Sequence, residues 1–133
     1  MKKIVLIVFA VIFSFPIQAA DESREKPTQH LQIADVTSME DAKEIFLEKT
    51  LEIRNMKNIH LEEASQIHII TYTLEKSVAY FAENLTGEKQ SLAKEMAVVV
   101  EDIHLSSENN RLEKLQEHLR EYFDLVDEFV FCF

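Results

Sequence analysis

Beyond Val36 the chain contains no proline and a single glycine, Gly87. Sheet proteins need many turn residues to reverse the chain between strands, so this scarcity favours helices. Apolar residues recur along the same stretch at intervals of three and four, which is the period of one face of an α-helix. The sequence therefore predicts an all-α fold.

This spacing divides the chain into four helical segments with short connections. The first is expected to begin near Ser38 and to end at 56–58, the second to span about 61–85, the third about 88–105, and the fourth to begin near Asn109. The expected core positions are Met39, Ala42, Phe46, Ile53, Met56, Ala64, Ile67, Thr71, Leu74, Val78, Phe81, Leu85, Leu92, Met96, Val99, Ile103, Leu112, Leu115, Leu119, Tyr122, Val126, Phe129 and Phe133. Because short connections make consecutive helices antiparallel neighbours, we predict an up-down-up-down antiparallel four-helix bundle over residues 38–133.

Three short motifs mark the predicted helix ends. The run Thr37-Ser38-Met39-Glu40 offers a capping box for the first helix, in which a hydroxyl and a carboxylate satisfy free backbone amides. Gly87 suits either a left-handed C-cap of the second helix or the tight turn after it. Ser106 and Ser107 are expected to cap the fourth helix.

Residues 1–19 have the features of a cleavable export signal. Lys2 and Lys3 precede an apolar run, and small residues around Ala19 offer a cleavage site. The apolar run is about half of the roughly 20 residues that a transmembrane helix needs, so we predict a signal peptide rather than a membrane anchor. After cleavage, an irregular arm at 20–37 precedes the bundle, and the protein is expected to be periplasmic or secreted, with no membrane span.

The charge of the predicted mature chain narrows the classes of partner. Removal of two lysines with the signal leaves 12 basic against 24 acidic residues. Such a surface repels phosphate backbones and anionic lipids, so nucleic-acid binding is not expected. The single cysteine, Cys132, cannot form an internal disulfide, and it is either an apolar residue of the last turn or the source of an intermolecular disulfide.

Two stretches of the sequence, 66–75 and 100–108, carry a resemblance to a known group of proteins. The first reads Gln-Ile-His-Ile-Ile-Thr-Tyr-Thr-Leu-Glu and the second reads Val-Glu-Asp-Ile-His-Leu-Ser-Ser-Glu. They resemble the His-x-x-Thr-Tyr-Thr-Leu-Glu and Val-His-Leu-x-Ser-Glu stretches of small exported Gram-negative bacterial proteins that form an uncharacterised family, a domain of unknown function. The resemblance implies a periplasmic helical protein and brings no known activity.

The same two stretches contain the candidate site. If the second and third helices reverse near 86–87, His68 lies level with His104, and Tyr72 follows His68 one turn later on the same side. This arrangement predicts a Zn²⁺ or Cu²⁺ site, because imidazole nitrogen suits both ions. Its ligands would be the two imidazoles and the phenol, with a carboxylate from Glu75, Glu101 or Glu108. The alternative is that both rings hydrogen-bond along a helix flank or form a pH-sensitive packing pair.

The last residues of the chain are apolar on all sides of a helix. A helix that packs on one face cannot hide Phe129, Val130, Phe131 and Phe133 together, so some of them are expected to meet a protein partner or a second copy. The alternative is that this tail folds over the open end of the bundle.

The sequence lacks the motifs of hydrolytic catalysis. It contains no Gly-x-Ser-x-Gly elbow, no His-Glu-x-x-His pair and no glycine-rich phosphate loop. We therefore expect a non-enzymatic partner-binding protein without a bound cofactor. The alternative is a metal-binding or metal-sensing protein that uses His68 and His104.

Overall fold

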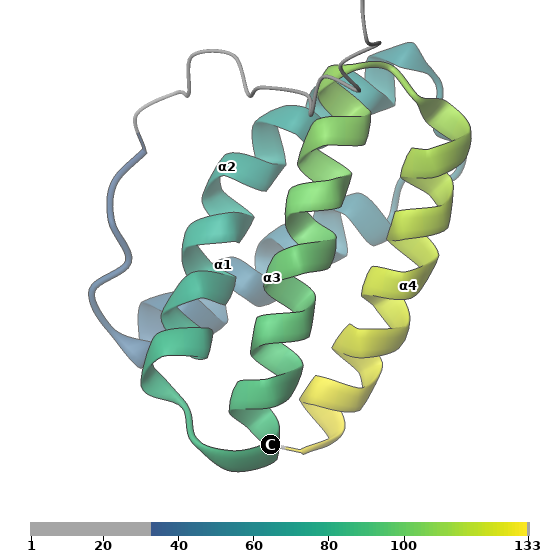
Figure 1. Ribbon diagram of the computed structural model, residues 1–133. Helices are drawn as coiled ribbons and strands as arrows, with labels where there is room; N and C mark the ends of the chain where they lie inside the picture. Colours follow the sequence, from purple (N-terminus) through teal and green to yellow (C-terminus); the bar gives the residue numbers. More distant parts are fainter. Residues whose placement is uncertain (1–32, 133) are drawn as a thin grey trace, which may run out of the picture.

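The computed structural model describes residues 33–132 and forms a bundle of four helices (Figure 1). They are α1 (Met39–Arg54), α2 (Leu61–Asn84), α3 (Gly87–Glu108) and α4 (Leu112–Phe131). Helices α2, α3 and α4 lie side by side with alternating directions, as the short connections between them require (Figure 1). The predicted all-α bundle is confirmed, whereas the predicted signal peptide and the arm up to residue 32 lie outside the described residues.

Helix α1 is placed differently from the other three. Figure 1 shows that it runs obliquely behind α2 and α3 toward α4. It packs directly on α2, but no Cα atom of α1 lies within 8 Å of a Cα atom of α3 or α4. Large side chains therefore bridge the wider gap between α1 and α4, and among them Phe46 and Phe129 meet with ring centroids 5.6 Å apart.

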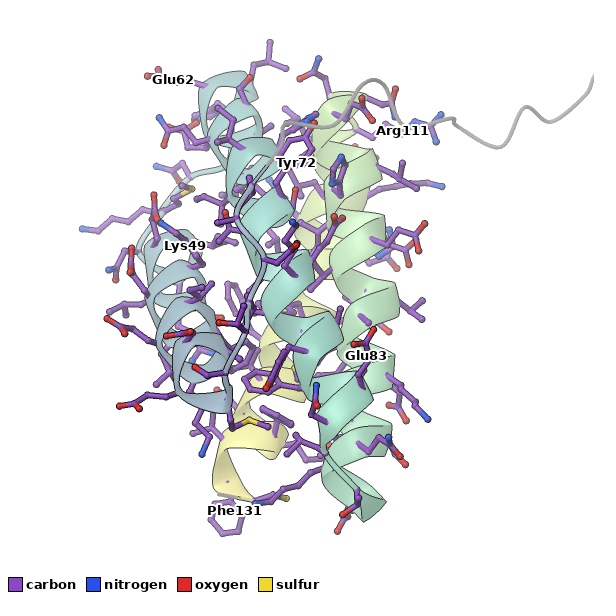
Figure 2. All side chains as sticks on the ribbon, turned by 90° about the vertical axis from the view of Figure 1, so that its left-hand side faces the viewer. Lys49, Glu62, Tyr72, Glu83, Arg111 and Phe131 are labelled. Atoms are coloured by element: carbon purple, nitrogen blue, oxygen red, sulfur yellow. The ribbon has the colours of Figure 1, made fainter. Side chains whose placement is uncertain are left out.

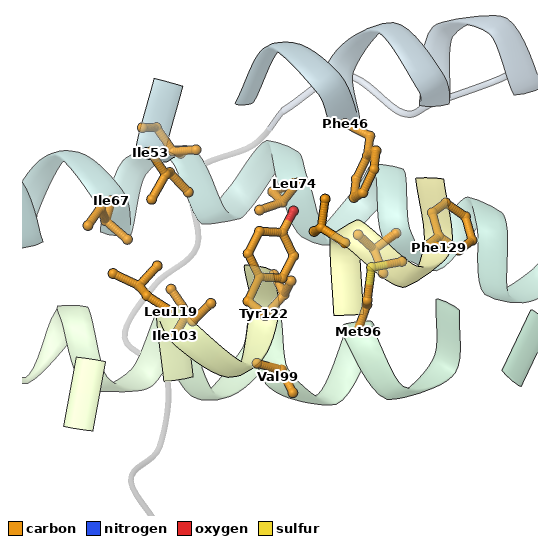
Figure 3. Close-up of a cluster of buried hydrophobic side chains, with 14 of the residues drawn as sticks. Phe46, Ile53, Ile67, Leu74, Met96, Val99, Ile103, Leu119, Tyr122 and Phe129 are labelled. Carbon is orange, nitrogen blue, oxygen red and sulfur yellow. The ribbon is translucent and has the colours of Figure 1, made fainter. Parts of the chain in front are cut away.

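The core runs along the bundle axis, with Phe46 and Phe129 at one end of the cluster and Ile53 and Ile67 at the other (Figure 3). Most positions predicted from the spacing are buried, and these are Ala42, Phe46, Ile53, Ala64, Ile67, Thr71, Leu74, Val78, Phe81, Leu92, Met96, Val99, Ile103, Leu115, Leu119, Tyr122, Val126 and Phe129. Met39, Met56, Leu85 and Leu112 are partly buried against the edge of this core. The period of the sequence thus identified the inward face of every helix.

The buried residues outside the predicted seams lie mainly on the two central helices. They are Ile70 and Ser77 on α2, and Ala93, Val100, His104, Ser106 and Ser107 on α3, with Thr50 on α1. Helix α2 packs against α1 and α3, and α3 packs against α2 and α4, so each central helix buries two faces. A single apolar stripe per helix cannot predict the second face, especially where it is polar.

A buried hydrogen bond joins α1 to α4 through the core. The hydroxyl of Thr50 lies 2.6 Å from the phenol of Tyr122, and either group can donate. Both side chains are buried, so each hydroxyl satisfies the other where water does not reach. Burial raises the pKa of the Tyr122 phenol far above its ordinary value, which keeps it a neutral hydrogen-bonding group.

Two of the predicted caps are placed differently in the structure. Helix α1 is capped by Ser38, whose hydroxyl accepts a hydrogen bond from the Asp41 amide at 3.1 Å, so the predicted Thr37–Glu40 pairing is off by one residue. The prediction that Ser106 and Ser107 cap α4 is wrong. Both residues continue α3, and their hydroxyls donate to carbonyls of their own helix, while Asn110 takes the left-handed conformation that starts the turn.

Gly87 is the first residue of α3, directly after the short connection 85–86, and has a φ of +67°. Of the two predicted alternatives, this position is closer to the tight turn than to a C-cap of α2. An added Cβ would meet no atom within 4 Å, so the cost of a substitution comes from the backbone conformation alone. We expect Gly87→Ala to lower the free energy of unfolding by about 1–2 kcal/mol, the usual cost of a left-handed L-residue. Gly87→Asn is the matched control and is expected to cost less, since asparagine tolerates this region. Urea unfolding of both variants tests this expectation, and equal losses would contradict it.

Candidate functional site

The candidate site lies between α2 and α3, in the half of the bundle that contains Glu62 and Arg111 (Figure 2). Helix α2 carries His68 and Tyr72 one turn apart, and α3 carries His104. The ring centroids of His68 and His104 lie 4.9 Å apart, those of Tyr72 and His104 4.8 Å, and those of His68 and Tyr72 5.1 Å. The prediction that His68 lies level with His104, with Tyr72 one turn along on the same side, is confirmed.

Polar contacts hold each imidazole in this cluster. His68 Nε2 lies 2.9 Å from the Tyr72 hydroxyl. His104 Nδ1 lies 2.8 Å from Oε1 of Glu75, which follows Tyr72 on the next turn of α2. Of the three carboxylates that the sequence left open, Glu75 thus lies within ion-pair distance of His104.

Two hydroxyl side chains donate hydrogen bonds to the backbone carbonyls of the two histidines. Thr71 donates a hydrogen bond to the His68 carbonyl at 2.6 Å, and Ser107 donates to the His104 carbonyl at 2.8 Å. Both hydroxyls are thereby satisfied within their own helices, so they can be buried at the interface between α2 and α3. His104 is buried more deeply than the flank position considered from the sequence, since only 2% of the residue is exposed.

The environment of His104 favours its protonated form. The Glu75 carboxylate, which accepts from the protonated imidazole, raises the pKa of His104 above the ordinary histidine value, and burial acts in the opposite direction. The negative charges of Glu75, Glu108 and Glu101 add to the rise. A protonated His104 and an ionised Glu75 then form a charge-assisted pair across the interface.

One ring nitrogen of each histidine is in contact with a partner inside the cluster. Nε2 of His68 contacts the Tyr72 hydroxyl, and Nδ1 of His104 contacts the Glu75 carboxylate. Across residues 33–132, no group of three or more histidine, cysteine, aspartate or glutamate side chains is arranged so that it could hold a metal ion. The contacts between the rings fit the packing pair that the sequence left as an alternative, and the metal site stays a prediction.

The C-terminal aromatic residues divide between core and surface. Phe129 is fully buried and belongs to the core, so it is not available to a partner. Val130 is exposed and Phe131 is 92% exposed, whereas Phe133 lies outside the described residues. Cys132 is half-buried against the edge of the core.

Leu47 of α1 lines the same pocket as Val130 of α4, and it was not among the residues predicted from the sequence. Leu47 and Val130 line a small pocket of about 170 Å³, whose floor is formed by Phe46 and Phe81. We call Leu47, Val130 and Phe131 the tail patch. Its apolar side chain lies outside the core stripe of α1, and that position could have indicated a contact surface. Only the oblique course of α1, however, places Leu47 beside α4.

No helix in the described part of the chain combines the length and apolar character needed to cross a membrane.

Comparisons with known proteins place the chain in a family. Comparison with curated proteins and with solved structures gives no significant match. The family model described as a family of unknown function (DUF6746) matches residues 1–130, which is nearly the whole chain and includes both stretches that carry the resemblance. The chain belongs to this uncharacterised family.

Proposed function

We propose that this protein is a non-enzymatic binding protein of the periplasm or the extracellular space, and that it binds a protein partner through the tail patch. The observation that carries the proposal is the exposure of Leu47 and Val130 at the apolar pocket of about 170 Å³, together with the 92% exposure of Phe131, the next residue along α4. Leaving a phenylalanine in water costs free energy that a partner would recover by burying it. An apolar side chain of the partner would occupy the pocket.

Two further observations support this function over the alternatives. The amino-terminal residues resemble an export signal, and a protein of this size with no catalytic motif is more plausibly a binding module than an enzyme. Within residues 33–132 no group of three or more metal-ligating side chains is arranged around His68 and His104, which supports a structural role for that pair over a Zn²⁺ or Cu²⁺ site.

Substitutions in the tail patch are expected to remove binding without affecting the fold. The double variant Val130→Ser/Phe131→Ser should keep its free energy of unfolding within about 0.5 kcal/mol of the wild type, as is usual for exposed positions. It should fail to capture the partner that the wild-type secreted form captures from a periplasmic extract. If the partner is a second copy of the chain, the solution mass of the wild type should exceed that of the variant.

The matched control is Ile69→Ser/Val98→Ser, which removes two exposed apolar side chains from α2 and α3. This control should bind the partner as the wild type does. If both double variants bind equally well, or if both lose binding to the same extent, the tail patch is not the binding surface.

A further inference from the structure

A second pocket of about 430 Å³ lies where the C-terminal end of α1, the connection 55–60 and the middle of α4 meet. Figure 1 shows this connection rising behind the upper part of α4. The pocket exists because α1 crosses the bundle obliquely and its backbone stays away from that of α4. Its volume falls within the range of roughly 300–1,000 Å³ that is typical of small-molecule sites.

The lining of this pocket combines an apolar floor with a cationic rim. Ile59, Leu119 and Phe123 contribute apolar surface, and Arg54, Lys57 and Arg120 contribute positive charge. No aspartate or glutamate is among the described residues that line it. This composition is unexpected for a chain with 24 acidic and 14 basic residues, in which a random surface site would contain carboxylates.

The three cations differ in how they are engaged. Arg54 donates a hydrogen bond to the Asp127 carboxylate at 2.8 Å, and its guanidinium carbon lies 4.8 Å from the centre of the Phe123 ring. Lys57 and Arg120 are exposed, and neither takes part in an ion pair within residues 33–132. The two positive charges at the mouth of the pocket are therefore available to an anion.

We propose that this pocket binds a small organic anion with an apolar body, of the class of medium-chain carboxylates. The carboxylate head would pair with Lys57 and Arg120, because a guanidinium can donate two parallel hydrogen bonds to a carboxylate. The apolar body would lie against Ile59, Leu119 and Phe123. The acidic remainder of the surface excludes large polyanions, so the site selects small anions that reach the pocket without contacting the rest of the protein.

Three probes separate the contributions of the head and the body. Octanoate, octanol and inorganic phosphate are titrated into the secreted form by isothermal titration calorimetry at low ionic strength. Octanoate should bind saturably at one site, and octanol and phosphate should bind at least tenfold more weakly. Equal binding of octanol would show that the cations contribute nothing, and equal binding of phosphate would show that the apolar floor contributes nothing. Either result overturns the proposal, and so does a lack of saturable octanoate binding.

Charge-matched variants test whether the rim is responsible. Lys57→Gln/Arg120→Gln should weaken octanoate binding at least tenfold, which corresponds to about 1.4 kcal/mol. The control Lys94→Gln/Lys114→Gln removes the same number of charges from exposed positions that do not line the pocket, and it should leave the affinity unchanged. In spectra of the amide groups, octanoate should shift the signals of residues 56–60 and 116–123. Equal weakening in both variants, or shifts confined to other residues, would refute the assignment. Because the tail patch is not part of the pocket, failure here leaves the proposed function untouched.

Discussion

Replacing Phe46 with alanine is expected to lower the free energy of unfolding by about 3–5 kcal/mol, the usual cost of truncating a buried phenylalanine. The ring is 2% exposed and makes edge contacts with Phe81 of α2 and Phe129 of α4, at centroid distances of 5.5 Å and 5.6 Å. Because the backbones of α1 and α4 do not touch, this ring is one of the few connections between them. Its loss leaves a cavity that the widely spaced helices cannot close.

Urea unfolding followed by far-ultraviolet circular dichroism measures this loss, since the chain has no tryptophan to report by fluorescence. Phe131→Ala is the matched control, because it removes the same side chain from an exposed position. It should change the free energy of unfolding by no more than about 0.5 kcal/mol. A similar loss in the two variants would show that α1 does not depend on the Phe46 contacts.

Replacing Glu75 with glutamine is expected to lower the free energy of unfolding near pH 6 by about 1–2 kcal/mol, the scale of one charge-assisted hydrogen bond with a partly exposed partner. Glu75 raises the pKa of His104 in the folded protein, whereas in the unfolded chain that pKa returns to its ordinary value of about 6.5. A raised pKa stabilises the fold fully below the unfolded value, and the stabilisation disappears as the pH rises through the folded value. The difference between wild type and variant should therefore be largest below the unfolded pKa of about 6.5 and should shrink as the pH rises through the raised pKa of the folded protein.

The control for this experiment is Glu83→Gln, which makes the same charge change at an exposed position two turns further along α2. Its free energy of unfolding should follow the pH dependence of the wild type. The groups that face His104 are His68, Tyr72, Glu75, Glu101 and Glu108, and all except Glu75 are retained in the comparison. A loss that stays constant over the pH range would show that Glu75 does not act through the protonation of His104.

The position of the histidine pair could be predicted because it follows from local geometry alone. A short turn at Gly87 makes α2 and α3 antiparallel, so residues equally distant from the turn lie level with each other. The choice of Glu75 over Glu101 and Glu108 could not be made in this way, because a carboxylate reaches its partner only in one rotamer and all three were close enough along the chain. The hydrogen bond from Ser107 to the His104 carbonyl was missed as well, because a serine near a helix boundary is typical of an N-cap.

The spacing of apolar residues determined the four helices and the inward face of each, because a helix in water must hide its apolar stripe whatever its partner is. The course of α1 depended on the tertiary structure, since the angle between helices is set by how particular side chains interlock and not by their period. That angle decides that Leu47 meets Val130 and that a pocket with a cationic rim opens beside α4. Both proposed binding surfaces lie at this gap, which no pattern within a single helix encodes.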